Sequence, residues 1–377
     1  MAGDSPRFAR VLMSEPSGRV LRPAARAPDS FREEMMTSIA VKPVGIAWLR
    51  SRPFDLGFIL GIAAVAVAAG LATVVNPTLF PVLLFLDLWL LGYHHVISTF
   101  TRILFDRDSF SQYWFLVTVL PAIVIVAVVA MAWGLGVWSV VSLYLYWQWF
   151  HYARQSYGVA QAYRRKSNGL VTEDPITFQV IFYLVPLWGI LHRSAQDPAR
   201  FLGLELRVIP VPGVVADAVG AIALAALALW IGRKAFEAWR GRLAVAHTMF
   251  MASHFGIFVT GYVLIDGINE GWLVLNIWHN LQYIAFVWLY NNNRFRSGID
   301  PRHKLLSTLS QSRNVIFYLA VSLALSTGLY VLVREAIITV ASASFVYVVL
   351  AYQVFNFHHY VVDAVIWRSR RKAAAAA

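Results

Sequence analysis

The chain has 377 residues, of which 59% are hydrophobic and 14% are charged, and its apolar residues lie in long runs that are typical of a polytopic α-helical membrane protein and not of a β-barrel. It contains no cysteine, which excludes disulfides, iron–sulfur clusters, c-type haem and thiolate zinc sites, so any bound metal is expected to have nitrogen and oxygen ligands. The formal net charge of +12 comes from basic residues placed between apolar runs, which indicates anionic lipid headgroups as partners and argues against nucleic acid.

The chain opens with a segment, residues 1–45, that is rich in Arg, Pro, Ser and Ala and has no apolar period. Such a composition buries too little apolar surface to fold, so a disordered basic tail is predicted. No signal peptide is expected, because no apolar core lies near Met1. A single transmembrane helical domain is predicted for residues 46–370, and a short tail for residues 371–377.

About ten apolar segments follow one another in this domain, each near the length of roughly 20 residues that a bilayer-spanning helix needs. The third span is expected to bend at Pro121. Basic residues cluster in alternate loops, which predicts ten spans with both termini cytoplasmic, in a bacterial inner membrane; the loop 192–211, with three arginines, is the exception. We expect the spans at residues 54–75, 78–105, 113–135, 137–163, 175–191, 214–232, 244–265, 272–290, 314–333 and 337–367.

Eight of the ten histidines lie inside apolar segments, where a polar group is costly unless it pairs with another group, with water or with a metal. On the predicted topology, five segments each place a histidine roughly 10 to 22 Å beneath the cytoplasmic ring of basic residues. A single membrane histidine is more often a packed hydrogen-bonding residue than a ligand, but agreement in depth predicts one intramembrane metal centre. His247, only five residues past Arg242, is the weakest candidate. The predicted ligands are His94, His95, His151, His254, His279, His358 and His359.

Other polar side chains share helical faces with these histidines. Gln353, Asn356, His359 and Asp363 recur at steps of three and four and form one polar stripe. Metal-bound imidazoles usually donate their second N–H to a carboxylate or amide, although such residues also hold membrane helices together without any metal. The expected outer partners are Asp87, Gln148, Gln155, Asn276 and Asn356, and the expected catalytic residues are Asp363, Tyr283 and Gln282.

A histidine-rich, polytopic chain with a cytoplasm-facing centre resembles the integral-membrane di-iron oxygenases, such as fatty-acid desaturases and hydroxylases, and is similar to the bacterial carotene-cleaving dioxygenases. The pairs His94-His95 and His358-His359 are similar to the end of a desaturase histidine box, although boxes of the forms HxxxH and HxxHH are absent. Residues 357–361 also resemble a haem–copper oxidase ligand run. The oxygenase resemblance implies two irons, a lipid or isoprenoid substrate and a separate electron-donor protein.

Three functions therefore stay open at this point. The leading one is a membrane-embedded non-haem metal-dependent oxygenase that hydroxylates, desaturates or cleaves a lipid or isoprenoid. The second is a haem-binding redox protein with histidines as axial ligands. The third is an ion- or proton-coupled transporter or channel in which the histidines and Asp363 form a relay, a function that interrupted helices would indicate.

Overall fold

The computed structural model describes residues 47–341 and 345–367, and these residues belong to one compact unit. The tails expected at residues 1–45 and 371–377 lie outside the described residues. The described part is almost entirely helical, which confirms the all-α prediction; its two short strands, β1 (Arg200–Phe201) and β2 (Leu204–Glu205), pair in an antiparallel hairpin.

The helices follow the predicted apolar segments closely. The first half contains α2 (Arg52–Leu56), η1 (Gly57–Gly61), α3 (Ile62–Val75), η2 (Pro77–Leu79), α4 (Phe80–Leu86), η3 (Asp87–Gly92), α5 (Tyr93–Leu104), α6 (Arg107–Thr118), α7 (Leu120–Gly134) and α8 (Val137–Lys166). The second half contains α9 (Pro175–Ala195), α10 (Gly213–Trp239), α11 (Val245–Val259), η4 (Thr260–Leu264), α12 (Ile268–Arg294), η5 (Pro301–His303), α13 (Lys304–Leu309), η6 (Ser312–Asn314), α14 (Val315–Ala341) and α15 (Phe345–Ile366).

The observed helix boundaries differ from the predicted ones at several places, and two of these differences are informative. The third predicted span is divided between α6 and α7, which meet at Val119 beside Pro121, and the backbone also leaves helical geometry at Tyr113. The break predicted after Val333 is wrong, because α14 continues to Ala341. The charges that suggested this break, Arg334 and Glu335, form an exposed ion pair of 2.7 Å within the helix.

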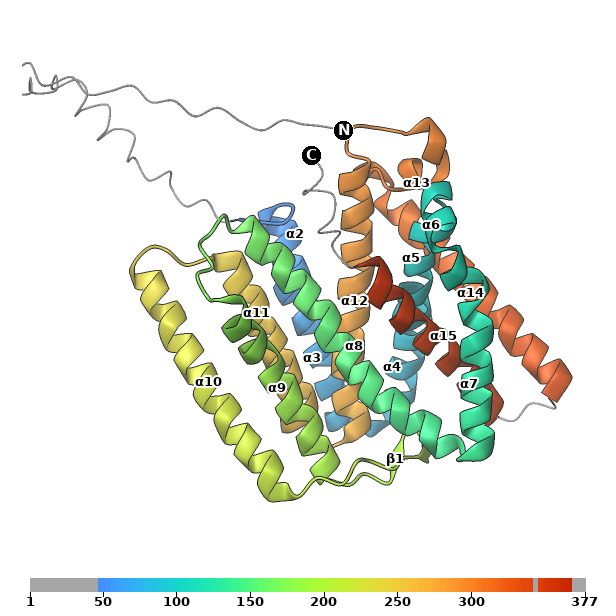
Figure 1. The fold of residues 1–377 in the computed structure, drawn as a ribbon, viewed down its shortest axis with the longest axis horizontal. Coiled ribbons are helices and arrows are strands. Elements are labelled where there is room, and N and C mark those ends of the chain that lie inside the picture. Colours follow the sequence, from blue (N-terminus) through green and yellow to red (C-terminus); the bar gives the residue numbers. More distant parts are fainter. Residues whose placement is uncertain (1–46, 342–344, 368–377) are drawn as a thin grey trace, which may run out of the picture. The chain divides into compact units, whose positions relative to one another are not determined.

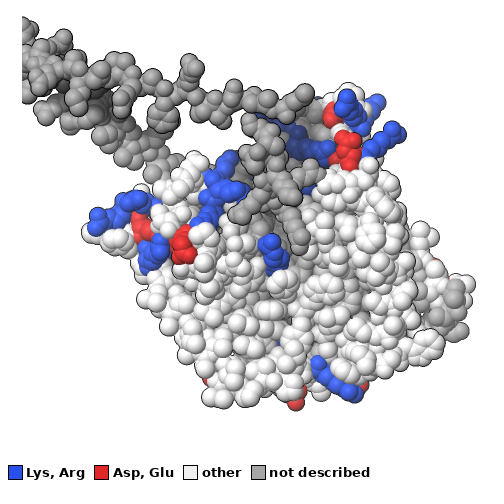
Figure 2. Space-filling view, viewed as in Figure 1, with Lys and Arg blue, Asp and Glu red and all other residues white. Residues whose placement is uncertain are grey.

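Six of the described helical stretches are long and apolar enough to cross a membrane, which supports an integral membrane protein. They cover residues 52–75, 77–104, 107–134, 175–195, 213–239 and 312–339. Among the described residues, α8, α12 and α15 do not meet this criterion, and each of them carries predicted site histidines. Figure 2 shows the corresponding charge distribution: Lys and Arg gather toward the ends of the helices, and a nearly uncharged band lies between them.

Local signals explain several helix ends. Asp106 precedes α6, and its carboxylate accepts hydrogen bonds from the backbone N–H groups of Asp108 and Ser109, which the first turn would otherwise leave unpaired. Asp174 caps α9 in the same way, and a proline follows it at the first helical position. Gly136, with φ of +99°, makes the turn that joins α7 to α8.

Helix α12 lies at the centre of the unit, with α8 crossing in front of it in the view of Figure 1, α9 and α10 on one side, and α7, α14 and α15 on the other. Close backbone approach holds η4 against α12, because a Cβ at Gly271 would collide with the carbonyl oxygen of Gly261. The fully buried Arg193 of α9 ties down the same region by donating hydrogen bonds to the backbone carbonyls of Gly261 (2.9 Å) and Asp266 (2.6 Å). These contacts hold η4 and the chain that follows it against α9 and the first turns of α12.

Candidate metal centre

Four histidines from four different helices meet inside the unit: His95 of α5, His151 of α8, His279 of α12 and His359 of α15. The ring centroid of His95 lies 4.7 Å from that of His359 and 5.2 Å from that of His279. The centroid of His151 lies 4.9 Å from His279 and 5.0 Å from His359. None of the four is more than 6% exposed. We call these residues the four-histidine cluster.

The ring nitrogens of this cluster are largely without hydrogen-bond partners among the described residues. Both nitrogens of His95 and of His279 are unpaired, as is Nε2 of His151 and of His359. Leaving buried polar atoms unpaired costs about 1–3 kcal/mol each, so six such atoms in one place call for a ligand. Nitrogen atoms of His95, His279 and His359 lie within 4.8 Å of one another, and so do ligand atoms of His151, His359 and Asp363. This spacing suits one or two metal ions.

Asp363 and two hydroxyl groups orient His359. The Oδ1 atom of Asp363 accepts hydrogen bonds from the Tyr283 hydroxyl (2.5 Å) and the Thr99 hydroxyl (3.3 Å), and its Oδ2 lies 3.6 Å from Nε2 of His359. The Thr99 hydroxyl is also 3.0 Å from Nδ1 of His359. In the tautomer that carries its proton on Nδ1, His359 donates to Thr99, whose hydroxyl donates to Asp363, and the lone pair of Nε2 faces the cluster. Trp367 completes the arrangement by donating its indole N–H to the Tyr283 oxygen at 3.2 Å.

A second polar network lies against His279. Asp87, in the π-helical turn η3, accepts hydrogen bonds from the side-chain amides of Asn276 and Asn280. The Tyr152 hydroxyl donates to the Asn276 carbonyl oxygen, and the Tyr152 ring centroid is 4.1 Å from that of His279. The predicted partner Gln148 donates to Tyr152 and, at 3.4 Å, to Asn276. Asp87, Gln148 and Asn276 thus support the cluster through Tyr152 and make no hydrogen bond to a histidine.

The other predicted partners are placed less directly. Gln155 donates to the backbone carbonyl of His279 at 3.3 Å, and Asn356 donates to Gln353 at the same distance. Gln282 is fully buried, with neither amide atom hydrogen-bonded. No hydrogen bond joins Gln282 or Asn356 to the cluster within residues 47–341 and 345–367.

Three of the seven predicted ligands lie outside the cluster. His254 is held between the Ser156 hydroxyl (3.0 Å) and the Phe182 carbonyl (3.2 Å), so both of its ring nitrogens are already used. His358 donates to the Leu116 carbonyl at 2.6 Å. Neighbouring side chains on a helix point about 100° apart, so only one member of each adjacent pair reaches the cluster: His95 rather than His94, and His359 rather than His358.

Two further buried histidines, His247 and His303, lie apart from the cluster. His247 is buried, and both of its nitrogens lack partners among the described residues, but its ring packs on Phe178 and it does not reach the cluster. His303, a loop histidine that the spans exclude, lies 3.5 Å from Asp106. Arg294 already forms a 2.5 Å ion pair with that carboxylate, whereas Nδ1 of His303 has no hydrogen-bond partner among the described residues.

Three residues of the site are absent from the sequence-based list: Thr99, Tyr152 and Tyr360. The Tyr360 ring stacks on His151 at 4.3 Å, and Thr99 contacts His359, Tyr283 and Asp363. Thr99 lies four residues after His95, a spacing that places both on one helical face and offered a usable signal. Tyr152 and Tyr360 simply follow histidines in the chain, which carries no such information.

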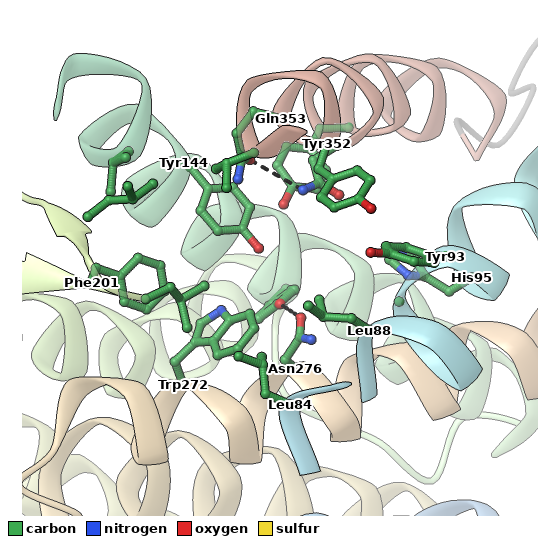
Figure 3. A pocket seen from close by; sticks show the side chains of 18 of the residues that line it. Leu84, Leu88, Tyr93, His95, Tyr144, Phe201, Trp272, Asn276, Tyr352 and Gln353 are labelled. Carbon is green, nitrogen blue, oxygen red and sulfur yellow. Dashed lines mark hydrogen bonds between the residues drawn. The ribbon is translucent and has the colours of Figure 1, made fainter. Parts of the chain in front are cut away.

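Two cavities flank the cluster. The first, about 200 Å³, reaches His95, Tyr152 and Asn276, and its remaining walls are mostly apolar and aromatic. Figure 3 shows Tyr144 and Trp272 on one side of it and His95 on the other. The second, about 180 Å³, has His151, Tyr283 and Asp363 in its wall. The cluster therefore separates two spaces that an apolar molecule can enter.

Membrane-spanning helices around a buried four-histidine cluster define an integral membrane protein with a candidate intramembrane metal centre. Comparison of the chain with protein-family models, with curated proteins and with solved structures found no match. The chemistry of the site is therefore argued from its own residues.

Proposed function

We propose that this protein is a membrane-embedded, non-haem, metal-dependent oxygenase that hydroxylates, desaturates or cleaves a lipid or isoprenoid. The observation that carries the proposal is the four-histidine cluster itself, whose unpaired nitrogens lie between two largely apolar cavities. An apolar substrate and a polar centre then share one enclosed space, as oxidation of an unactivated carbon chain requires.

The donor set supports iron, because imidazole and carboxylate groups are common iron ligands and thiolates are absent. The two groups of ligand atoms share His359, so the cluster fits one ion held by His95, His279 and His359 or by His151, His359 and Asp363, or two ions of which one uses His359 and the other Asp363. Haem is less well supported, because imidazole centroids separated by at most 5.2 Å leave no space for a macrocycle among them. When bound, iron supplies O₂ activation with electrons from a separate donor protein.

The chain's own residues have distinct tasks in this proposal. Asp363 and Thr99 fix the tautomer of His359, and the Tyr283 hydroxyl, which donates to Asp363, holds a proton beside the cluster. The Tyr152 and Tyr360 rings pack on His279 and His151 and exclude water from those imidazoles. A substrate in either cavity would lie against apolar side chains and next to at least one histidine of the four-histidine cluster.

The proposed topology has ten spans with both termini on the cytoplasmic side of a bacterial inner membrane. It is supported by the helices that cover the described parts of the predicted segments and by the basic residues in alternate loops. In this topology the more polar helices α8, α12 and α15 also cross the membrane, and the more apolar helices surround them. Because the chain has no cysteine, single cysteines placed in successive loops and labelled with an impermeant maleimide test this topology directly.

Metal analysis tests the function. Detergent-purified protein is expected to contain one or two irons per chain and to show no Soret band, and a His279→Ala/His359→Ala double variant, which removes ligands from both groups, is expected to lose them. A Soret band would favour the haem function. Full activity after quantitative metal removal would overturn the oxygenase, and a metal-free native protein would leave the cluster as a proton or ion relay.

A further inference from the structure

The second cavity runs along one face of α8, and we call it the α8 slot. The α8 residues that line it recur at helical spacing along one face, toward the end of α8 that is proposed to lie on the cytoplasmic side. Residues of α12 and of the α15 region form the opposite wall. Aromatic rings make up most of its apolar wall, and they are Trp147, Phe150, Tyr283, Phe286, Tyr360 and Trp367. Phe150 is 48% exposed, so the slot opens at the lateral surface of the helical unit. The slot therefore connects that surface with the residues beside the four-histidine cluster.

An arginine stands in this wall at an unusual depth. Arg154 lies one helical turn from His151 and ten residues before Arg164, which corresponds to about 15 Å along the axis of α8. Arginine at membrane depth is costly, and where it occurs it commonly marks a substrate or ion pathway. Its side chain is exposed and lines the slot.

The charge of Arg154 is not neutralised by the described part of the chain. Its guanidinium lies 5.4 Å from the Tyr157 ring centroid and interacts with the Tyr183 hydroxyl, and both groups are neutral. No Asp or Glu of residues 47–341 or 345–367 forms an ion pair with it. By contrast, the buried Lys234 is paired with both Glu173 and Glu237. An uncompensated guanidinium beside an apolar cavity is a binding element for an anion.

We propose that the α8 slot binds an apolar chain that carries a carboxylate, with the carboxylate on Arg154 and the adjoining carbons against the aromatic wall next to His151 and Asp363. One guanidinium matches the single charge of a carboxylate and its bidentate geometry. A phosphate monoester carries a charge of about −1.5 to −2 at neutral pH and needs a second cation to balance it. The other arginine of the slot, Arg165, is eleven residues further along α8, a rise of about 16 Å along the helix axis, so the two arginines are attached to the slot wall at well-separated points.

This inference deepens the proposed function and rests on it in one respect, namely that the four-histidine cluster is the reacting centre. The substrate class is then a long-chain carboxylic acid drawn laterally from the bilayer. Oxidation would occur at carbons near the carboxylate, because Arg154 and His151 are only three residues apart on α8.

The slot can be blocked without disturbing the cluster. A Cβ at Gly158 of α8, which lines the slot, would meet no atom within 4 Å. Gly158 lies between the two arginines, so a Gly158→Trp side chain is expected to fill the slot rather than clash with the fold. Replacing glycine inside a helix also carries no propensity penalty.

The test is equilibrium binding of the fluorescent acid cis-parinaric acid and of its methyl ester to detergent-purified, full-length protein, with metal content measured on each sample. The wild type is expected to bind the acid about tenfold more tightly than the ester, a ratio equivalent to about 1.4 kcal/mol. Arg154→Gln is expected to abolish this preference, and Arg165→Gln, the matched control in the same slot, to keep it. Gly158→Trp is expected to weaken binding of both ligands.

Equal affinity for acid and ester in the wild type, or a preference that survives Arg154→Gln, overturns the inference. Tighter binding of dodecyl phosphate than of dodecanoate overturns the carboxylate assignment. The two proposals can fail separately. If the protein contains its metal but shows no preference for the acid, the oxygenase proposal stands and the carboxylate-site proposal is overturned. An acid preference in metal-free protein supports the slot and overturns the oxygenase.

Discussion

Adjacent histidines with opposite environments give the sharpest test of the metal centre. His359 points into the four-histidine cluster with Nε2 unpaired, whereas His358 stacks on Phe100 and donates to the Leu116 carbonyl at 2.6 Å. His359→Ala and His358→Ala are therefore matched substitutions at neighbouring, equally buried positions of α15, with exposures of 0% and 4%. Only the first is expected to remove metal.

The magnitude follows from the geometry. His359 belongs to both groups of potential ligand atoms, so its loss reduces each group to two ligands, whereas loss of His95 or His151 leaves the other group complete. Changing outer partners of metal ligands typically costs 10- to 100-fold in affinity, so loss of this shared ligand is expected to cost at least about 100-fold, or 2.7 kcal/mol. His358→Ala leaves the Leu116 carbonyl unpaired and is expected to cost about 1–3 kcal/mol of stability with metal affinity unchanged.

Competition with a chelator of known affinity, followed by elemental analysis of the protein, measures both affinities. Thermal unfolding in the same detergent measures the stabilities and identifies a variant that has simply failed to fold. The reasoning is refuted if both variants lose metal equally while remaining folded, or if His359→Ala keeps its full metal complement. The pair His95→Ala and His94→Ala extends the comparison to α5, where His95→Ala is expected to weaken only the group that His95 forms with His279 and His359.

Three other outcomes are expected. Gly271→Ala should lower the thermal stability by about 1–3 kcal/mol, because its Cβ overlaps the Gly261 carbonyl, and unchanged unfolding would contradict that close contact. Tyr283→Phe should keep the metal but slow turnover about 10²- to 10⁴-fold if its hydroxyl moves a proton, and equal rates at every pH would remove that role. Burial alone would raise the pKa of Asp106, but hydrogen bonds from Arg294 and Ser109 and the Arg294 charge outweigh it and hold that pKa below 3.8. The stabilisation is thus complete above about pH 4 and lost as the pH falls through the lowered pKa; Arg294→Gln should remove up to about 1 kcal/mol of it, seen as a flatter acid limb of unfolding.

The apolar pattern predicted the helices well because burial in lipid demands long, continuous hydrophobic runs. It failed at Arg334 and Glu335, where two opposite charges neutralise each other inside α14 and the helix continues. The pattern also predicted that histidines share a depth, since depth depends only on the number of residues from the basic helix ends.

Which histidines meet could not be predicted from depth. Convergence depends on the rotation of each helix about its own axis, and that rotation is set by packing with residues distant in the chain. His254 illustrates this: its depth is suitable, but α11 turns it toward Ser156 of α8 and Phe182 of α9. The contact of Thr99 with His359, across 260 residues of sequence, is likewise a product of packing.

The polarity of α8, α12 and α15 has a physical consequence for the fold. Each carries a member of the four-histidine cluster, and the described helices that meet the apolar criterion for a span do not include them. Such helices cannot present their polar faces to lipid, so those faces are expected to turn toward the interior of the unit, where packing then brings His151, His279 and His359 together. Arg154 is the exception, since it lies on α8 yet faces the α8 slot at the lateral surface. Packing has not turned Arg154 inward, and no acidic side chain of the described residues pairs with it. A carboxylate group of a lipid in the bilayer would supply the negative counter-charge for its guanidinium.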